Sequence, residues 1–348
     1  MARTPTSPPD DPAGRTHIGA AAADTTVSDE PLPVPTPLSR ADRKFRLRAG
    51  ETVPDGLRRA ARGRLAAGSN ALATAGDHDE RAEAVHDTRK AIKRVRAALR
   101  LSRAAVGEPT YRRENDGLRT IAGRLAGARD ARVMIDTLGA LERRCADEID
   151  PRTLRRLHER LRDDDERASA ALAGEGDLAV RTRQSLEEVR ARTAGWRLRS
   201  DGFDAIKPGL KRVYRQGRKR LRTARDEPTA ENLHALRKRV KDLRHAAELL
   251  REAHPKRMKR VAKDAHTLAT TLGDHHDLSA LRDYADANPQ LFSDMAARET
   301  LLAAIDRRAE TLRRRAVKHG RKLYKRSPKR FVKDIGRGWD KRVGAVRV

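Results

Sequence analysis

The sequence predicts an all-α fold that arises from an internal duplication, and three observations lead to this prediction. From about Val53 onward, Ala, Leu, Arg and Glu recur at helical spacing, without β-branched runs or sustained alternation. Gly, Pro, Asp and Asn interrupt this pattern at intervals that leave about ten helices, several of them long enough for bundle packing. A basic segment led by a histidine occurs twice.

Capping residues before prolines predict where some helices begin, and the composition of the N-terminal segment predicts where the chain has no packed core. Asp150-Pro151 and Asn288-Pro289 each place a capping residue before a proline at the first helical position, which is typical of a helix start. Residues 1–45 are rich in Pro, Thr, Ser, Ala and Asp, with few large apolar residues to offset the entropy of ordering. We therefore expect a disordered tail over 1–45 and helical repeats over 46–200 and 201–348.

The duplication rests on two pairs of segments. Residues 85–101 read VHDTRKAIKRVRAALRL, and residues 233–249 read LHALRKRVKDLRHAAEL, so that they align on their histidines. Downstream, LAGARD at 125–130 matches LGDHHD at 272–277. The offsets are 148 residues (86 to 234) and 147 residues (130 to 277). Two separate motifs at nearly one offset indicate a duplicated chain.

On a helix, each repeated segment carries an apolar stripe and, about 100° away, a basic row. The apolar residues are Val85, Ile92, Val95 and Leu99 in the first copy, and Leu233, Leu236, Val240, Leu243 and Leu250 in the second. The basic residues are His86, Arg89, Lys93, Arg96 and Arg100 in the first copy, and His234, Arg237, Lys241 and Arg244 in the second. Because the apolar stripe has to face a core, we expect each basic row at the rim or floor of a groove.

The composition of these rows suits phosphate. Arg offers forked donors, Lys a point charge, and His a donor that becomes cationic when an anion raises its pKa. The alternative is a solvated charged face. Solvated faces mix signs through i, i+4 pairs, whereas these rows are nearly of one sign and recur in both halves.

The charge of the whole chain also predicts an anionic partner. Lys and Arg number 78 against 50 Asp and Glu, which gives a net charge of +28. The stretches 207–225 and 312–333 are basic and contain no acid, whereas 142–190 has more acidic than basic residues. One cysteine, Cys145, leaves no cysteine-based metal cluster, and no run approaches the roughly 18 apolar residues of a membrane helix. We expect a cytoplasmic protein that does not enter a membrane.

The pattern H-x-x-R-K-x-x-K, which begins at His86 and at His234, is followed by G-x-R-D and by G-x-x-H-D. With these motifs the sequence resembles the CHAD domain, the conserved histidine α-helical domain, over about residues 50–340. The resemblance implies two pseudo-symmetric four-helix bundles whose basic helices face a shared central groove or pore. It implies inorganic polyphosphate as the ligand and association with polyphosphate granules. The residues that it assigns to polyphosphate binding are His86, Arg89, Lys90, Lys93, Arg96, His234, Arg237, Lys238, Lys241 and Arg244.

Three further cations join this candidate set. The resemblance extends to Tyr214-Arg215 and to the tail that contains Arg321. Arg215 and Arg222 lie in the acid-free stretch 207–225, and Arg321 lies in the acid-free stretch 312–333. The second copy also departs from the first, with Asp242 in place of Arg94 and Glu248 in place of Arg100. We expect the C-terminal half of the second basic helix to contribute less to the grip on the ligand.

Two other functions remain as alternatives. RNA or DNA binding depends on the same phosphate contacts, but neither repeated helix contains an aromatic residue for base stacking. A polyphosphate-processing enzyme would need a catalytic partner for the histidines, and none is evident, so we expect no catalytic residue and no cofactor. The adjacent histidines of Asp274-His275-His276-Asp277 point about 100° apart on a helix, which favours a turn or an interhelix contact over a metal site. Divalent cations that bridge a bound polyanion are a further expected partner.

Overall fold

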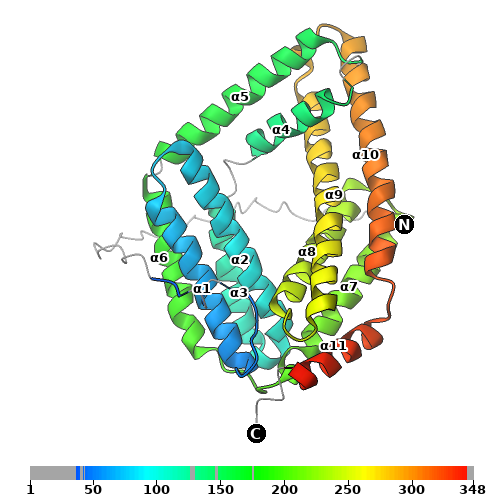
Figure 1. Ribbon diagram of the computed structural model, residues 1–348. Helices are drawn as coiled ribbons and strands as arrows, with labels where there is room; N and C mark the ends of the chain where they lie inside the picture. Colours follow the sequence, from blue (N-terminus) through cyan, green and yellow to red (C-terminus); the bar gives the residue numbers. More distant parts are fainter. Residues whose placement is uncertain are drawn as a thin grey trace, which may run out of the picture. The chain divides into compact units, whose positions relative to one another are not determined.

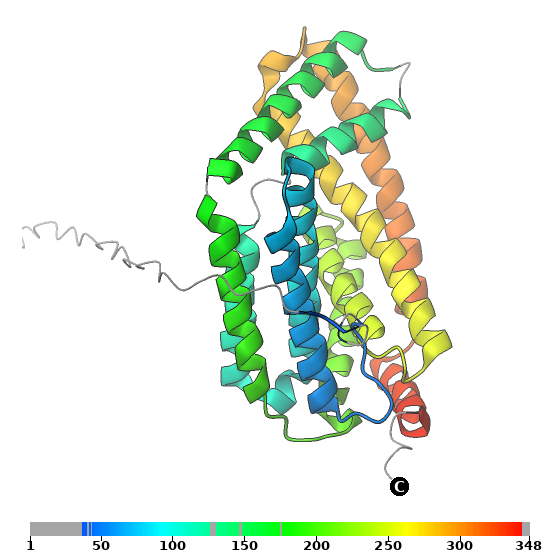
Figure 2. The ribbon, with the colours of Figure 1, turned by 60° about the vertical axis from the view of Figure 1, so that its left-hand side comes forward.

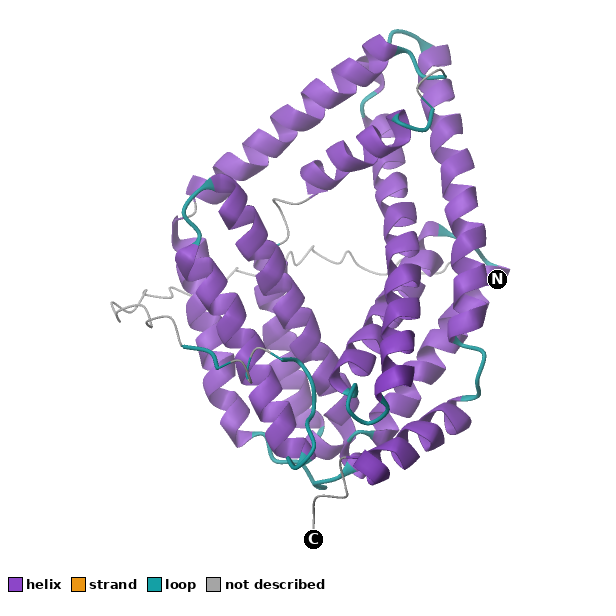
Figure 3. Cartoon of the chain, in the orientation of Figure 1, coloured by secondary structure: helices purple, strands orange, loops and turns teal. Residues whose placement is uncertain are grey.

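The structure is a computed structural model that describes residues 37–39, 42, 44–125, 130–145, 148–174 and 176–342. These residues form α-helices, short 3₁₀ turns and connecting loops, with no strand among them (Figures 1 and 3). The prediction of an all-α fold is confirmed. None of the described helices is long and apolar enough to cross a membrane.

Eleven α-helices lie within the described residues. Their bounds are α1 Val53–Thr74, α2 His78–Val106, α3 Glu108–Arg124, α4 Asp130–Glu142, α5 Pro151–Gly174, α6 Gly176–Arg192, α7 Lys207–Asp226, α8 Ala230–Leu249, α9 Pro255–Ala287, α10 Met295–Leu323 and α11 Pro328–Arg342. The 3₁₀ turns are η2 Thr193–Gly195, η3 Phe203–Ala205 and η4 Pro289–Leu291.

Side-chain caps explain where several helices begin. At the start of α2, the Asp77 carboxylate accepts the backbone N–H of Glu80, whose side chain accepts the N–H of Asp77 in return. The predicted cap at Asp150 is confirmed, since its carboxylate accepts the N–H of Thr153 at 3.1 Å. At Asn288 a helical turn does begin, since Asn288 is the N-cap residue of the 3₁₀ turn η4 and Pro289 is its first residue, but the Asn288 side chain makes no capping hydrogen bond. Its side-chain amide donates to the carbonyl of Tyr284 at the end of α9, and only the short turn η4 follows.

The predicted apolar stripes of the two basic helices are buried. Ile92, Val95 and Leu99 of α2 are fully buried, and Val85, near the start of the helix, is half-buried. On α8 the whole predicted stripe from Leu233 onward is buried. Because these stripes are fixed against the core, the basic rows on the same helices have fixed directions as well.

Three apolar cores hold the helices together. The first joins α1, α2, α3 and α6 around residues such as Leu65, Ile92 and Trp196. The second joins α1 and α2 to α7, α8, α9 and α11. The third packs α4 and α5 onto α9 and α10, which run side by side in both views (Figures 1 and 2). Two cores thus draw on both sides of residue 200, and the division into two duplicated bundles there stays a prediction.

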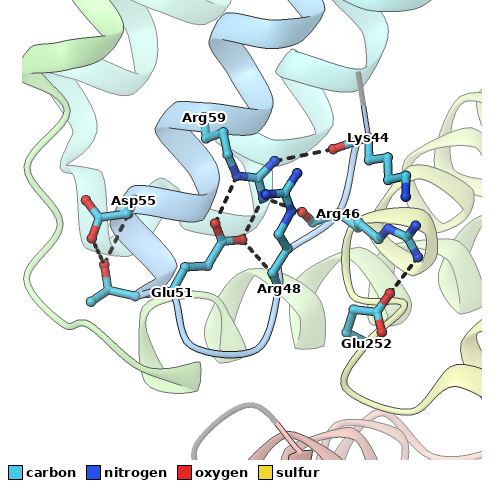
Figure 4. A network of polar contacts seen from close by, with 8 residues as sticks. Lys44, Arg46, Arg48, Glu51, Asp55, Arg59 and Glu252 are labelled. Atoms are coloured by element: carbon cyan, nitrogen blue, oxygen red, sulfur yellow. Dashed lines mark hydrogen bonds and ion pairs between the residues drawn. The ribbon is translucent and has the colours of Figure 1, made fainter. Parts of the chain in front are cut away.

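The segment that precedes α1 packs against the chain at two points (Figure 4). Phe45 and Leu47 are buried, and the Leu47 N–H donates to the carbonyl of Leu249. The Arg59 guanidinium binds Glu51 and the carbonyl of Arg46, whose own side chain pairs with Glu252 at 2.6 Å. Phe45 was the last residue of the predicted disordered tail. Residues 1–36, 40, 41 and 43 of that tail lie outside the described residues.

Candidate polyanion-binding surfaces

The basic row of α8 lies along the seam between α8 and α9. The ring of His234 packs against the ring of His276 from α9, with 4.4 Å between their centroids and a tilt of 43°. One turn further on, the Arg237 guanidinium lies directly over Gly273, where any side chain would meet it at about 3.0 Å. The glycine of the downstream motif therefore makes room for the arginine of the basic row.

The remaining residues of this row follow the same seam. Arg244 donates to Nδ1 of His266 on α9 at 3.0 Å and pairs with Glu248 one turn below at 3.0 Å. Lys241 is half-buried and Lys238 is exposed. Along this seam, partly buried cations of α8 lie beside histidines of α9.

His234 is neutral at neutral pH in this environment. Burial lowers its pKa to about 4, and the positive charges of His276, Lys238, Arg237 and Lys241 act in the same direction. A bound phosphate would offset these charges and favour the protonated imidazole. His234 is therefore a donor whose charge depends on the presence of an anion.

The basic row of α2 lies in the corresponding seam between α2 and α3. The Arg89 guanidinium donates to the carbonyl of Leu125, the C-cap residue that follows α3. Arg96 donates from Nε to the side-chain oxygen of Asn115 on α3 at 3.1 Å. Burial and the neighbouring Arg100 lower the pKa of Arg96. Two arginines of the row are thus held in place by α3 before any ligand binds.

The exposed end of the α2 row is formed by His86 and Lys90, and Lys93 is half-buried. Lys90 pairs with Asp87 one turn before it at 3.1 Å, and both side chains are about half exposed. An exposed pair of this kind contributes little energy, so a phosphate can compete for the lysine.

The common offset of the two motifs has a physical cause. Arg89 reaches Leu125, and Arg237 lies over Gly273, which follows Leu272, the counterpart of Leu125. In each half, therefore, the arginine three residues after the leading histidine meets the start of the downstream motif. The two motifs therefore lie next to each other across neighbouring helices in both segments.

The downstream motif differs between the two halves. LGDHHD lies inside the long helix α9, so the turn that was one of its predicted forms is absent, and His276 makes the other predicted form, an interhelix contact. In the first half, α3 ends at Arg124 and residues 126–129 lie outside the described residues. Within the described part of the chain, no group of three His, Cys, Asp or Glu side chains is arranged to hold a metal ion.

The two basic helices are joined to each other by reciprocal ion pairs. Arg100 of α2 binds Asp242 of α8 at 2.9 Å, and Arg94 binds Glu248 at 3.3 Å. Asp242 is buried and also pairs with Arg239 at 3.1 Å. In the sequence alignment, Asp242 is the counterpart of Arg94 and Glu248 the counterpart of Arg100, both at 148 residues. The two departures of the second copy thus neutralise cations of the first copy.

The remaining candidates do not belong to either row. Arg215, Arg222 and Arg321 line a separate groove between α7 and α10. The candidate residues accordingly form three groups: the α2–α3 row, the α8–α9 row and the α7–α10 groove. Sequence reasoning did not include His276, His266 or the groove residue Arg218 among the candidates for ligand binding. His276 stands in the repeated motif itself, which was the available signal.

Comparisons with known proteins agree with this architecture. The family model described as the CHAD domain matches residues 59–286. An uncharacterized protein found in two strains of Mycobacterium tuberculosis is 28% identical over 213 residues, which are 58% of this chain and 40% of that protein. The chain thus spans less than half the length of these curated relatives.

Two solved structures share the fold. The CHAD domain from the plant Ricinus communis superposes with a TM-score of 0.61 at 20% identity, over 83% of this chain and 96% of that one. PptA from Streptomyces chartreusis superposes with a TM-score of 0.53 at 17% identity, over 80% of this chain and all of that one. At these identities the likeness concerns the fold alone.

Proposed function

The chain belongs to the CHAD domain family, and we propose that it binds inorganic polyphosphate through the histidine-led rows of α2 and α8, without hydrolysing it. The observation that carries the proposal is the pair of matching seams, α2–α3 and α8–α9, in which Arg and His side chains contact the neighbouring helix before any ligand binds. Donors that are already oriented lose less entropy when an anion binds. A ligand that is all phosphate suits such rows, because it requires charge and hydrogen bonds but no base stacking.

Nucleic acid is the second candidate, since its backbone offers the same charges. The rows themselves contain no Phe, Tyr or Trp, and the Tyr111 ring of α3, near Arg96, is already covered by the Arg103 guanidinium at 4.4 Å, which gives bases few surfaces on which to stack. Divalent cations that bridge phosphates would be further partners, and association with polyphosphate granules would follow from the binding itself. Phosphate release from polyphosphate by the purified protein with Mg²⁺ would instead favour the enzyme.

A competition assay tests the choice of ligand. Fluorescently labelled single-stranded RNA is bound to the protein and long-chain polyphosphate is added at equal phosphate concentration. We expect polyphosphate to displace the RNA. RNA that holds its place against an excess of polyphosphate would assign the rows to nucleic acid.

Substitution tests the rows themselves. Lys93→Glu combined with Lys241→Glu should weaken polyphosphate binding on the order of a hundredfold or more, because two charge-assisted contacts are lost and two repulsions are added. The matched control is Lys259→Glu with Lys263→Glu, which reverses two exposed lysines on α9. Circular dichroism verifies that both variants keep their helicity, and Lys93→Gln with Lys241→Gln serves if the first variant does not fold. Equal affinity in row and control variants would show that the rows are solvated faces only.

A further inference from the structure

A groove of about 690 Å³ opens between α7 and the end of α10, and every charged residue that lines it is basic. None of the described residues that line it is acidic. The cations that line it include Arg215, Arg218, Lys219 and Arg222 of α7, with Arg321 of α10 and Lys325 just beyond it. The lining therefore has one sign of charge over two helices that are about 100 residues apart in sequence.

These cations differ from others on the same helices in their partners. Arg313 and Arg314 of α10 both pair with Glu310, and Lys207 at the start of α7 pairs with Asp204 at 3.0 Å. Among the described residues, no carboxylate pairs with the six groove cations named above. Arg225, at the end of the groove, pairs with Asp226. Six cations that share one groove without a counter-charge raise the local positive potential, and an anion would relieve it.

Two glycines build the groove. A side chain on Gly217 of α7 would collide with the Tyr324 hydroxyl, and one on Gly320 of α10 would collide with Leu221. α7 and α10 therefore approach closely at this point, and Leu221, Val317 and Tyr324 form an apolar floor between the charged walls. Tyr324 is buried, and its ring lies edge-on to that of Tyr214, which is stacked on Phe331. Because α7 and α10 pack closely around Tyr324, the backbone positions that carry the arginines and lysines are set relative to each other.

We infer that the α7–α10 groove is a second site for a linear phosphate polymer, separate from the two histidine-led rows. None of its lining residues comes from α2, α3, α8 or α9, so the groove shares no lining residue with either row. The identity of the ligand rests on the proposed function, whereas the existence of the site rests on the groove itself.

The arrangement of the cations fits a chain better than a single phosphate. Arg215, Arg218, Arg222 and Arg225 follow one face of α7 at spacings of three and four residues, and at 1.5 Å per residue they extend over about 15 Å. One phosphate has room for two or three guanidinium groups, which leaves the rest of the row without a partner. A polymer that runs along α7 would meet each turn of the helix with a new phosphate.

Lysine footprinting tests the inference directly. The wild-type protein is acetylated with and without long-chain polyphosphate, and modification is measured by mass spectrometry. We expect polyphosphate to protect Lys219 and Lys325, but not the control lysines Lys259 and Lys263 on α9. The same protection should persist in the Lys93→Glu, Lys241→Glu variant, because the groove is independent of the rows.

The outcomes separate this inference from the proposed function. Polyphosphate that protects Lys93 and Lys241 but leaves Lys219 and Lys325 as reactive as the controls would overturn the groove site and leave the proposed function standing. Protection of Lys219 and Lys325 by single-stranded RNA and not by polyphosphate would overturn the ligand assigned to the groove, and the proposed function would fall as well only if polyphosphate also left Lys93 and Lys241 unprotected. Loss of groove protection in the folded row variant would overturn the independence of the two sites.

A groove variant supplies the second measurement. Arg218→Glu with Arg222→Glu should weaken binding of a short polyphosphate to one class of site about tenfold or more, while the other class keeps its affinity in calorimetric titration. The control Lys259→Glu, Lys263→Glu makes the same change in net charge. A groove variant that binds as the control does would contradict the inference.

Discussion

At His234, burial and a ring of positive neighbours act on one imidazole, which lies against His276 and between the cations of α8. Its pKa of about 4 leaves it neutral in the free protein. Sequence alone predicted a cationic histidine at the head of each row, induced by the anion. Because the pKa of His234 is lowered in the free protein, we expect the imidazole to take up a proton when the anion binds.

The affinity for polyphosphate should therefore rise as the pH falls from 7 toward 5. In the free protein the pKa of His234 is about 4, below its ordinary value of 6.5. A bound anion raises the pKa of His234, so that binding takes up protons. His276 of α9 faces His234, and Arg237, Lys238 and Lys241 of α8 are the positive charges that the anion offsets. Calorimetric Kd values at several pH values measure the slope, and His234→Gln should flatten it. A slope that is the same in wild type and His234→Gln would contradict this assignment.

The same group affects the stability of the free protein in the opposite sense. Because the folded pKa lies below the unfolded one, the unfolded chain holds more protons at this site between pH 6.5 and about 4. The contribution of His234 to stability is thus present above pH 6.5 and decreases as the pH falls through that window. Acidification favours binding and disfavours the unliganded fold.

At the scale of the helices, α2 and α8 are linked by charges that lie close to their basic rows. Arg100 and Asp242 are mostly buried, and each is a row or near-row residue on its own helix. Breaking such a pair leaves the other charge in a poorly hydrated place, which costs more than the pair itself contributes. The junction of the two helices is therefore sensitive to single substitutions.

A double-mutant cycle on Arg100→Met and Asp242→Asn should give a coupling energy of about 1–3 kcal/mol in chemical denaturation. The exposed pair Lys207–Asp204 is the control, and its coupling should stay below about 0.5 kcal/mol because water screens it. Equal coupling in the two cycles would mean that the α2–α8 pair is a surface contact only.

Sequence periodicity predicted the helices, the buried stripes and the basic rows, because each depends on neighbours three or four positions away. Contacts between distant segments could not be predicted in this way. Asp242 and Glu248 were visible as departures from the repeat, but their partners Arg100 and Arg94 lie 142 and 154 residues away. The groove likewise depends on the close approach of Gly217 to Tyr324, two residues too far apart in sequence for helical periodicity to relate them. At Asn288 the helix that follows is only the short turn η4, and the Asn288 side chain donates back to the carbonyl of Tyr284 in α9 instead of capping η4.

At the scale of the whole molecule, the chain has a net charge of +28. Like charges in two rows and one groove repel one another until an anion is present. A ligand that binds only the folded chain stabilises it, and here it also relieves that repulsion. Binding and folding are thus expected to be strongly coupled and strongly dependent on salt.

The affinity for polyphosphate should fall linearly on a plot of log affinity against log salt concentration, with a loss on the order of a thousandfold between 50 and 200 mM salt. The Lys93→Glu, Lys241→Glu variant should show a shallower line, because fewer phosphates are neutralised. Filter binding or calorimetry over a salt series measures both slopes. An affinity that does not change with salt would contradict a charge-driven grip.

The reciprocal pairs between α2 and α8 also bear on the predicted duplication of the chain. Each contact joins one aligned position to the other aligned position, which is the pattern that a twofold relation between two copies would produce. Two copies of the first half would set Arg94 against Arg100, and two copies of the second would set Asp242 against Glu248. Either pairing of two identical halves would place like charges next to each other in a half-buried contact. The pairing of the first half with the second places opposite charges there. In a chain duplicated as the sequence predicts, this junction favours the pairing of two unlike halves over the pairing of two identical ones.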